Sequence, residues 1–233
     1  MDPLNYNPVI VALDVESRAE ALSLIDKLDD SADFYKIGME LYAAEGTTVI
    51  KDLLERGKKV FLDLKFHDIP ETVRRAVSRA AQLGVHFLTV HAHRQIMAAA
   101  VDGNVGGTLK LLGVTVLTSV SETELADLGY PPQTKIIDLV RQRVAMGIDI
   151  GMDGFVCSPL EVAGVRHLTG PEKILVTPGV RSPGRDRGDQ KRVATPAQAM
   201  ADGASYLVVG RQISRAADPR AEIKAIHREI LSL

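Results

Sequence analysis

The sequence predicts an α/β protein of the (β/α)8 (TIM) barrel class, folded as one domain over residues 1–233. Short runs of β-branched and apolar residues alternate along the chain with alanine- and leucine-rich stretches of helical length. This alternation passes through eight strand-like runs without a linker or a low-complexity tract. A length of 233 residues also suits an undivided barrel of this kind.

The expected strands are Val9–Asp14, Phe34–Gly38, Val60–Lys65, Phe87–His91, Leu111–Thr118, Gly154–Cys157, Ile174–Thr177 and Ser205–Val209. The expected helices are Arg18–Leu28, Thr47–Arg56, Glu71–Leu83, Gln95–Val101, Ile136–Met146, Glu161–Leu168, Pro196–Ala201 and Ala221–Leu231. An open, doubly wound sheet is the main alternative, and a dinucleotide-binding sheet of that type would carry a G-x-G-x-x-G turn after its first strand. Val15-Glu16-Ser17-Arg18 stands there instead, with Ser17 as a typical helix N-cap, so the barrel is favoured.

The composition excludes several classes of protein. The formal net charge is -2 with acids and bases interspersed, which argues against a nucleic-acid partner. Cys157 is the only cysteine, so an internal disulfide is impossible and a reducing compartment is expected. The chain shows neither a signal peptide nor the ~18 consecutive apolar residues of a membrane span, so we expect a cytoplasmic protein without a membrane partner.

The segment from Val60 to Pro70 holds the most informative charges. Side chains alternate between the two faces of a strand, so Asp63 and Lys65 share the face opposite to Val60, Leu62 and Leu64. That shared face points towards the barrel axis near its upper end, where barrel enzymes place their active sites. Asp68 follows just beyond the strand, and Pro70 suits the first turn of the next helix.

Two earlier strands end with charges of the same parity, Asp14 on the first and Lys36 on the second. Asp14, Lys36, Asp63 and Lys65 are therefore expected to converge at one mouth of the barrel. A buried ion-pair network that only fills the barrel top is the structural alternative, but such networks stabilise a fold weakly. Charges at the ends of three consecutive strands favour a functional site.

A second set of residues follows the last two strands and suggests phosphate binding. Arg181 and a polar loop that includes Gln190 come after the seventh strand, and Gly210-Arg211 ends the eighth. Barrels often bind phosphate at these two positions. Glycine lets an anion approach backbone N–H groups, and the arginine fork matches phosphate oxygens. A solvated surface turn remains the alternative for the loop by itself.

Three other candidates are weaker. His91 and His93 at the end of the fourth strand could be metal ligands, but no third ligand is evident nearby. Cys157 lies in an expected strand and suits a packed core thiol better than a nucleophile. His67 suits a hydrogen bond that orients its loop rather than a catalytic role.

At these residues the chain resembles the orotidine 5′-phosphate decarboxylase family in its bacterial form. The blocks that carry the resemblance run in order along the chain: Val11-Ala12-Leu13-Asp14, Lys36-Ile37-Gly38, Asp63-Leu64-Lys65-Phe66-His67-Asp68-Ile69-Pro70, Val114 to Ser119, Val176 to Arg181, Gly188-Asp189-Gln190 and Val209-Gly210-Arg211. One stretch departs from the family pattern. His91-Ala92-His93-Arg94-Gln95 stands where the family usually has small residues that include glycine.

The resemblance implies decarboxylation of orotidine 5′-phosphate to UMP without a metal or an organic cofactor. It implies a homodimer in which the partner chain contributes Asp68, Ile69 and Thr72 to each site. Within one chain it implies that Lys65 delivers a proton to C6 and that Asp63 lies near the departing carboxylate. The remaining implied contacts are Asp14 and Lys36 at the ribose, Thr118 and Ser119 at the pyrimidine, and Arg181, Gln190, Gly210 and Arg211 at the phosphate.

Two alternatives stay open at the level of sequence. A metal-dependent sugar-phosphate lyase or epimerase also places acids and lysines at strand ends of this scaffold, and it would lose activity with chelators. A non-catalytic nucleotide-binding protein would keep the phosphate contacts and bind UMP without turnover. The combination of Asp63, Lys65 and Asp68 argues against the second alternative.

Overall fold

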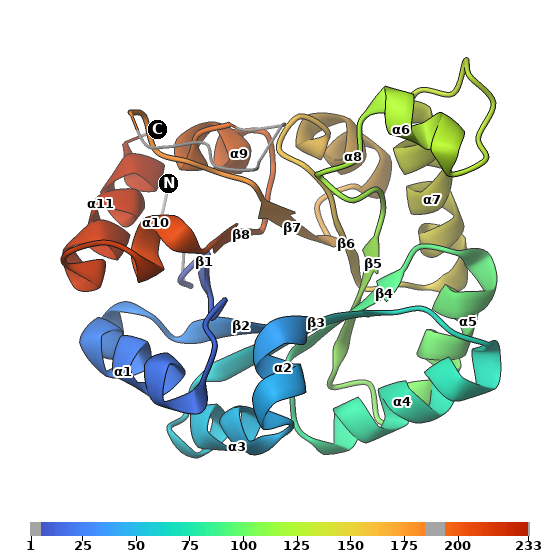
Figure 1. Cartoon of the computed structure of the whole chain (residues 1–233). Coiled ribbons are helices and arrows are strands. Elements are labelled where there is room, and N and C mark those ends of the chain that lie inside the picture. The colour runs from blue at the N-terminus through green and yellow to red at the C-terminus, as the bar shows by residue number, and fades with distance from the viewer. Residues whose placement is uncertain (1–5, 185–193, 233) are drawn as a thin grey trace.

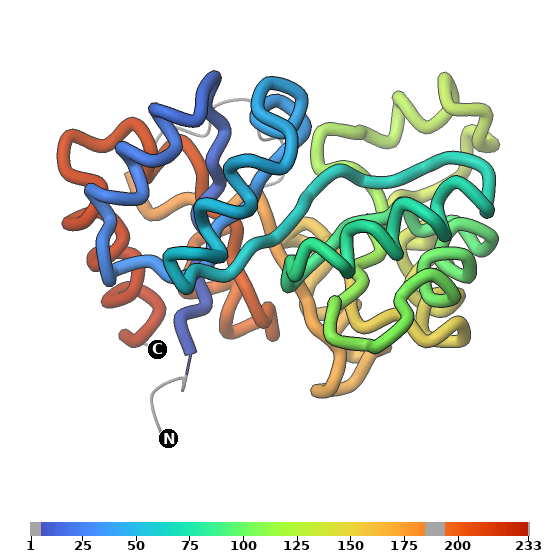
Figure 2. The backbone as a smooth tube through the Cα atoms, turned by 90° about the horizontal axis from the view of Figure 1, so that it is seen from below, coloured from blue at the N-terminus to red at the C-terminus, as the bar shows by residue number. Residues whose placement is uncertain are grey.

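The computed structural model describes residues 6–184 and 194–232, and its eight parallel strands form a closed barrel in chain order (Figure 1). The barrel closes where β8 pairs with β1, with Ile10 opposite Val208. Helix α11 lies beside α1 on the outside, so the last helix completes the outer ring against the first (Figures 1 and 2). The predicted (β/α)8 barrel is therefore confirmed.

The strands are β1 (Val9–Ala12), β2 (Phe34–Gly38), β3 (Lys59–Phe66), β4 (Phe87–His91), β5 (Lys110–Val114), β6 (Gly154–Val156), β7 (Ile174–Pro178) and β8 (Tyr206–Val209). The helices are α1 (Arg18–Leu28), α2 (Met39–Glu45), α3 (Thr48–Glu55), α4 (Pro70–Gln82), α5 (Arg94–Gly103), α6 (Glu122–Asp127), α7 (Ile136–Ile150), α8 (Val162–Thr169), α9 (Pro196–Ala201), α10 (Arg211–Ser214) and α11 (Pro219–Leu231), with a 3-10 turn at Asp29–Ser31. None of the helices described here is long and apolar enough to cross a membrane.

Two apolar clusters follow from the alternation of side chains along the strands. The inner cluster fills the barrel axis with residues such as Ile10, Phe34, Phe61 and Phe87, while the larger outer cluster packs strand residues such as Val9 against the helices. Within the inner cluster the rings of Phe34 and Phe87 meet edge to face at 4.9 Å, a preferred aromatic geometry. Because the lower axis is filled, the space along the axis for a substrate lies at the upper mouth.

The predicted helix starts agree with the local chemistry. Ser17 caps α1, because its hydroxyl accepts a hydrogen bond from the backbone N–H of Glu20 at 3.3 Å. Pro70 occupies the first turn of α4, where the backbone N–H that proline lacks would have no helical partner.

The predicted fifth strand is too long, because β5 ends at Val114 instead of Thr118. Beyond that point the side chain of Arg143, on α7, donates to the carbonyl oxygen of Thr115. Apolar and β-branched residues continue from Val114 to Leu117, past the end of β5, so periodicity could not mark the boundary.

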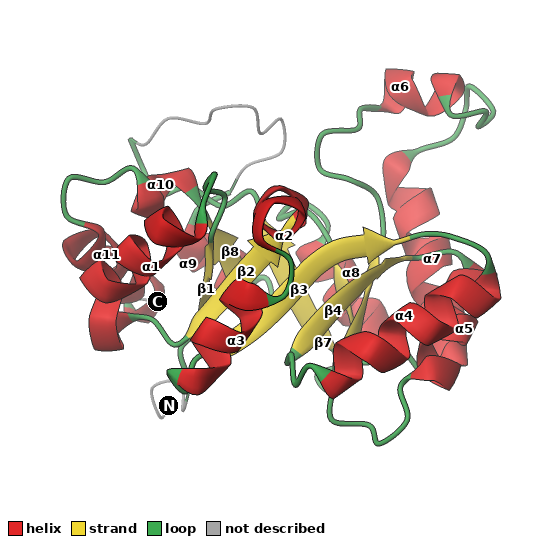
Figure 3. Ribbon diagram, turned by 60° about the horizontal axis from the view of Figure 1, so that its bottom comes forward, coloured by secondary structure: helices red, strands yellow, loops and turns green. Residues whose placement is uncertain are grey.

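Three short helices, α2, α6 and α10, were not predicted. All three lie on the side of the barrel towards which the strand arrows point (Figure 3). Before α6, the backbone N–H of Ser121 donates to the carboxylate of Glu124 at 2.6 Å. Ser-x-x-Glu is the capping-box pattern, so this helix start was readable from the sequence.

Candidate active site

Four charged side chains form a row of alternating sign at the mouth of the barrel. Lys36 Nζ donates to Asp14 Oδ1 at 2.9 Å and lies 3.8 Å from Asp63 Oδ2. Lys65 Nζ lies 2.9 Å from both carboxylate oxygens of Asp63. The structure thus brings together the charges that strand parity predicted to converge.

Solvent access increases towards the two ends of this row. The side chains of Lys36 and Asp63 are 10% and 13% exposed, whereas those of Lys65 and Asp14 are 25% and 52% exposed. Gly38 makes room for the row, since a Cβ there would lie 3.1 Å from Lys36 Nζ. A central ion pair shielded from water keeps its geometry and interacts strongly with a bound charge.

Thr89 on β4 belongs to this site, although the sequence analysis did not select it. Its hydroxyl donates to Asp63 Oδ1 at 2.9 Å and accepts from the backbone N–H of Lys65 at 2.9 Å. The readable signal was one hydroxyl-bearing residue between the apolar Leu88 and Val90 of a buried strand.

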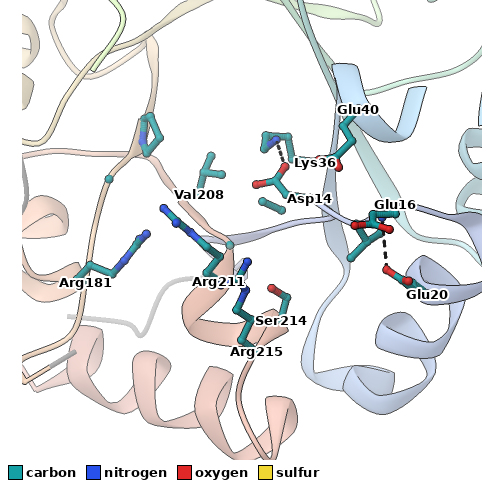
Figure 4. A pocket seen from close by; sticks show the side chains of 15 residues that line it. Asp14, Glu16, Glu20, Lys36, Glu40, Arg181, Val208, Arg211, Ser214 and Arg215 are labelled. Carbon is teal, nitrogen blue, oxygen red and sulfur yellow. Dashed lines mark hydrogen bonds and ion pairs between the residues drawn. The ribbon is translucent and has the colours of Figure 1, made fainter. Parts of the chain in front are cut away.

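The larger cavity at the mouth has a volume of about 600 Å³, within the ~300–1,000 Å³ typical of small-molecule sites. Arg181, Arg211 and Arg215 line one part of it, and acidic side chains including Asp14 and Glu40 line another (Figure 4). The sequence analysis did not identify Arg215 or Glu40. Such a cavity has a cationic part suited to a phosphate and an acidic part suited to hydroxyl groups.

The predicted phosphate residues lie at the expected strand ends where the structure describes them. Arg181 follows β7, and its Nη1 donates to the carbonyl oxygen of Val180 at 2.7 Å. Gly210 caps α10 directly before Arg211, and a Cβ on this glycine would lie 3.4 Å from Asp14 Oδ2. Gln190 lies outside the described residues.

A smaller pocket of about 150 Å³ adjoins the cavity and shares Lys36, Pro178 and Val208 with it. Its remaining lining consists of Phe61, Asp63, Lys65, Val114, Val116, Leu117, Thr118, Val156 and Cys157. Apolar walls beside one lysine and one aspartate suit a flat ring whose reactive atom faces the charges. Thr118 lines this smaller pocket, whereas Ser119 is exposed and lines neither pocket.

Asp68, Ile69 and Thr72 line neither pocket at this mouth within their own chain. All three are exposed, and Ile69 is 67% exposed despite its apolar side chain. Asp68 Oδ1 accepts from the backbone N–H of Ile69 at 2.6 Å. Asp68 and Ile69 line a separate open groove of about 530 Å³ that also includes His67 and His93.

Three imidazoles gather beside this groove. The ring of His67 stacks on His93 with centroids 4.8 Å apart and an interplanar angle of 10°, and it lies 5.2 Å from the ring of His91. Burial, reinforced by the neighbouring charges of His67, His93, Arg143 and Lys65, lowers the pKa of His91 to about 4. Burial also lowers the pKa of His93.

The hydrogen bond expected for His67 is not found among the described residues, where the ring contacts other imidazoles instead. No group of three or more His, Cys, Asp or Glu side chains in residues 6–184 and 194–232 has the arrangement of a metal site. Cys157, the single cysteine of the sequence, is buried, forms no internal disulfide and contributes to the wall of the smaller pocket.

Fold and site together define a barrel enzyme that acts on a small anionic substrate held at the C-terminal ends of the strands. A family model described as Orotidine 5'-phosphate decarboxylase / HUMPS family matches residues 7–226. The chain belongs to this family and is an enzyme of it.

Curated relatives match over nearly the whole length. Orotidine 5'-phosphate decarboxylase from Rhodopseudomonas palustris (strain BisB5) is 51% identical over 229 residues, which cover 98% of this chain and 97% of that protein. The protein of the same name from Methylobacterium sp. (strain 4-46) is 51% identical over 225 residues, covering 95% and 94%.

Solved structures show the same similarity. The crystal structure of orotidine 5'-phosphate decarboxylase from Lactobacillus acidophilus has a TM-score of 0.84 and 40% identity, and the match covers 97% of this chain and 99% of that chain. The structure of an uncharacterized conserved protein from Geobacillus kaustophilus has a TM-score of 0.83 at 34% identity, and covers 96% and 100%.

Proposed function

We propose that this protein decarboxylates orotidine 5′-phosphate to UMP, the last step of de novo pyrimidine synthesis, and that Lys65 supplies the proton to C6. One observation carries the proposal: Lys65 Nζ lies 2.9 Å from both oxygens of Asp63 at the edge of an apolar pocket. The names of the curated relatives agree with the reaction.

The reaction places specific demands on a protein without an organic cofactor. When the bond between C6 and the carboxylate breaks, CO2 leaves and the electron pair stays on C6, where no adjacent group can delocalise it. A preorganised ammonium stabilises this charge without much reorganisation in a site poor in water. The carbanion then takes a proton from Lys65, whose neutral amine regains one from solvent.

Asp63 and Lys36 prepare the lysine for this role. Asp63 holds the ammonium with both carboxylate oxygens and, in the proposed complex, lies near the departing carboxylate. Repulsion between the two carboxylates would then be relieved as CO2 leaves. Lys36 lies 3.8 Å from Asp63 Oδ2 and offsets part of the negative charge on the side towards Asp14.

The two pockets divide the substrate between them. The pyrimidine fits the apolar pocket with Thr118, the ribose hydroxyls lie near Asp14 and Lys36, and the phosphate lies near Arg181 and Arg211. Binding energy from the remote phosphate can offset the cost of positioning C6 against the lysine, so a contact far from the reacting bond raises kcat/KM.

We further propose that each site is completed by the partner chain of a homodimer, which contributes Asp68, Ile69 and Thr72. Residues 67–72 are exposed without interruption, including the apolar Ile69. A symmetric interface would cover Ile69, and the open groove of about 530 Å³ that Asp68 and Ile69 line offers a surface for the partner chain. Asp68 would then face the Lys65 of the neighbouring chain.

Turnover by purified protein tests the proposal directly. The absorbance change of the pyrimidine is followed with orotidine 5′-phosphate as substrate, in the presence and absence of EDTA. We expect turnover in both conditions, and a fall of more than about a thousandfold in kcat for Lys65→Ala. Lys51→Ala, on an exposed position of α3, is the matched control and should behave as the unmodified protein. Turnover that disappears with EDTA would contradict the mechanism.

A further inference from the structure

We propose that Thr89 is a positioning residue for the decarboxylation, because its one hydroxyl holds both the Asp63 carboxylate and the backbone of Lys65. The inference rests on the proposed function, since it deepens the role of these two residues. Thr89 touches neither the larger cavity nor the smaller pocket, so it acts through its neighbours.

Thr89 lies in the middle of β4 with its side chain fully buried. It shares its parity with Phe87, which belongs to the inner cluster, whereas Leu88 and Val90 belong to the outer one. Its hydroxyl therefore faces the barrel interior below the mouth. Burying a hydroxyl costs free energy unless it is hydrogen-bonded, so the hydrogen-bond partners of Thr89 offset this cost.

The hydroxyl of Thr89 both accepts and donates a hydrogen bond. The backbone N–H of Lys65 donates to Thr89 Oγ1 at 2.9 Å, which leaves the hydroxyl proton for Asp63 Oδ1, also at 2.9 Å. An ionised carboxylate can only accept, so the direction of both hydrogen bonds is determined. A hydrogen bond to a charged group is the stronger kind, and it orients the carboxylate that holds the lysine ammonium.

The backbone at Lys65 needs this support. Its φ of 49° is left-handed, and Asp29 is the only other non-glycine residue in the described part of the chain with a positive φ. The register between β3 and β4 shifts here, since Leu62 and Phe66 pair with Leu88 and Val90. Between these two pairs β3 advances by four residues while β4 advances by two, so the extra residues of β3 form a bulge.

This bulge explains why a side chain takes the place of a backbone acceptor. At Lys65 the hydroxyl of Thr89 receives the N–H that a regular ladder would pair with a carbonyl. A left-handed non-glycine residue persists only where its surroundings enforce it. Thr89 supplies that constraint and couples it to the orientation of Asp63, so one group determines how Lys65 Nζ meets the carboxylate.

Thr89→Val removes the hydroxyl at nearly constant volume and tests the proposal. We expect kcat to fall about 10- to 100-fold, as for a lost hydrogen bond to a charged group, while KM changes less than about threefold. Thr89→Ser keeps the hydroxyl and should restore kcat to within about threefold. A kcat for Thr89→Val close to that of the unmodified protein would overturn the proposal, as would equal losses in the valine and serine variants.

Thr177→Val is the matched control. Thr177, next to last in β7, is fully buried like Thr89, but its hydroxyl has no hydrogen-bond partner among the described residues. Its replacement should leave kcat unchanged. Should Thr89→Val fail to fold, Thr89→Cys replaces it with the same expectations, because a thiol is a weak hydrogen-bonding group.

A crystal structure of Thr89→Val separates this inference from the proposed function. We expect Lys65 Nζ to move away from the Asp63 oxygens, which lie 2.9 Å from it in the native arrangement. Unchanged distances would overturn the positioning role even if the native protein turns over its substrate. Absence of turnover by the native protein would refute the proposed function, while a displaced lysine would still support the structural role of Thr89.

Discussion

Mixing two inactive variants tests the shared active site most directly. Within one chain Asp68 is exposed, accepts from the backbone N–H of Ile69 and lines neither pocket at the mouth that holds Lys65. If the partner chain supplies it, Lys65→Ala and Asp68→Ala inactivate the same site from different chains. A mixed dimer then holds one site that lacks both groups and one site that has both.

The expected recovery follows from the symmetry of the dimer. Random exchange of equal amounts gives about half mixed dimers, and each holds one intact site of two, so about a quarter of the native activity per site should return. The assay follows the pyrimidine absorbance after subunit exchange, with native mass spectrometry to measure the mixed species. Lys65→Ala mixed with a chain that carries both substitutions is the control and should stay inactive. Mixed dimers without recovered turnover would refute the cross-chain role of Asp68.

The remaining predictions concern the phosphate contacts, the central ion pair and the histidine cluster. Arg211→Ala should lower kcat/KM by about a hundredfold or more, because phosphate binding energy is lost in the transition state. Arg220→Ala, which removes an ion pair outside the site, is the control. A loss below about tenfold in Arg211→Ala would contradict phosphate binding by Arg211. Lys36→Met should destabilise the fold by about 3 kcal/mol, since it leaves the largely shielded Asp63 carboxylate, 13% exposed, with less neutralising charge; urea unfolding measures the free energy. The lowered pKa of His91, about 4, means that the folded protein binds fewer protons than the unfolded chain between that pH and 6.5, so stability falls as pH falls through this window. In His91→Asn the slope of the unfolding free energy against pH in this range should be smaller, by the contribution of roughly one bound proton. An unchanged slope would refute the lowered pKa of His91.

The main features of the site could be predicted because strand parity is a local property. Asp63 and Lys65 are two residues apart, so their common face follows from the strand alone. The common mouth for Asp14 and Lys36 follows from a second rule, that parallel strands of a barrel end at the same edge. Neither rule needs knowledge of distant contacts.

Other parts of the site depend on contacts between segments far apart in sequence. Thr89 joins the site only because the β3–β4 register shifts and leaves the Lys65 N–H for its hydroxyl. Just beyond the end of β5, Arg143 on α7 donates to the carbonyl oxygen of Thr115. Apolar periodicity continues through both places, so no local pattern marks them.

The amino-acid sequence by itself determined the barrel class, the order of its elements and the row of lysines and aspartates, because these depend on short-range periodicity and on which residues end each strand. Only the tertiary structure decided that Lys65 adopts a left-handed backbone, that Thr89 bridges it to Asp63, and that three imidazoles gather beside the exposed Asp68 loop. The physical reason is that hydrogen-bond partners and ring contacts of this kind are set by the register and packing of neighbouring strands, and side chains distant in sequence meet only once the barrel has closed.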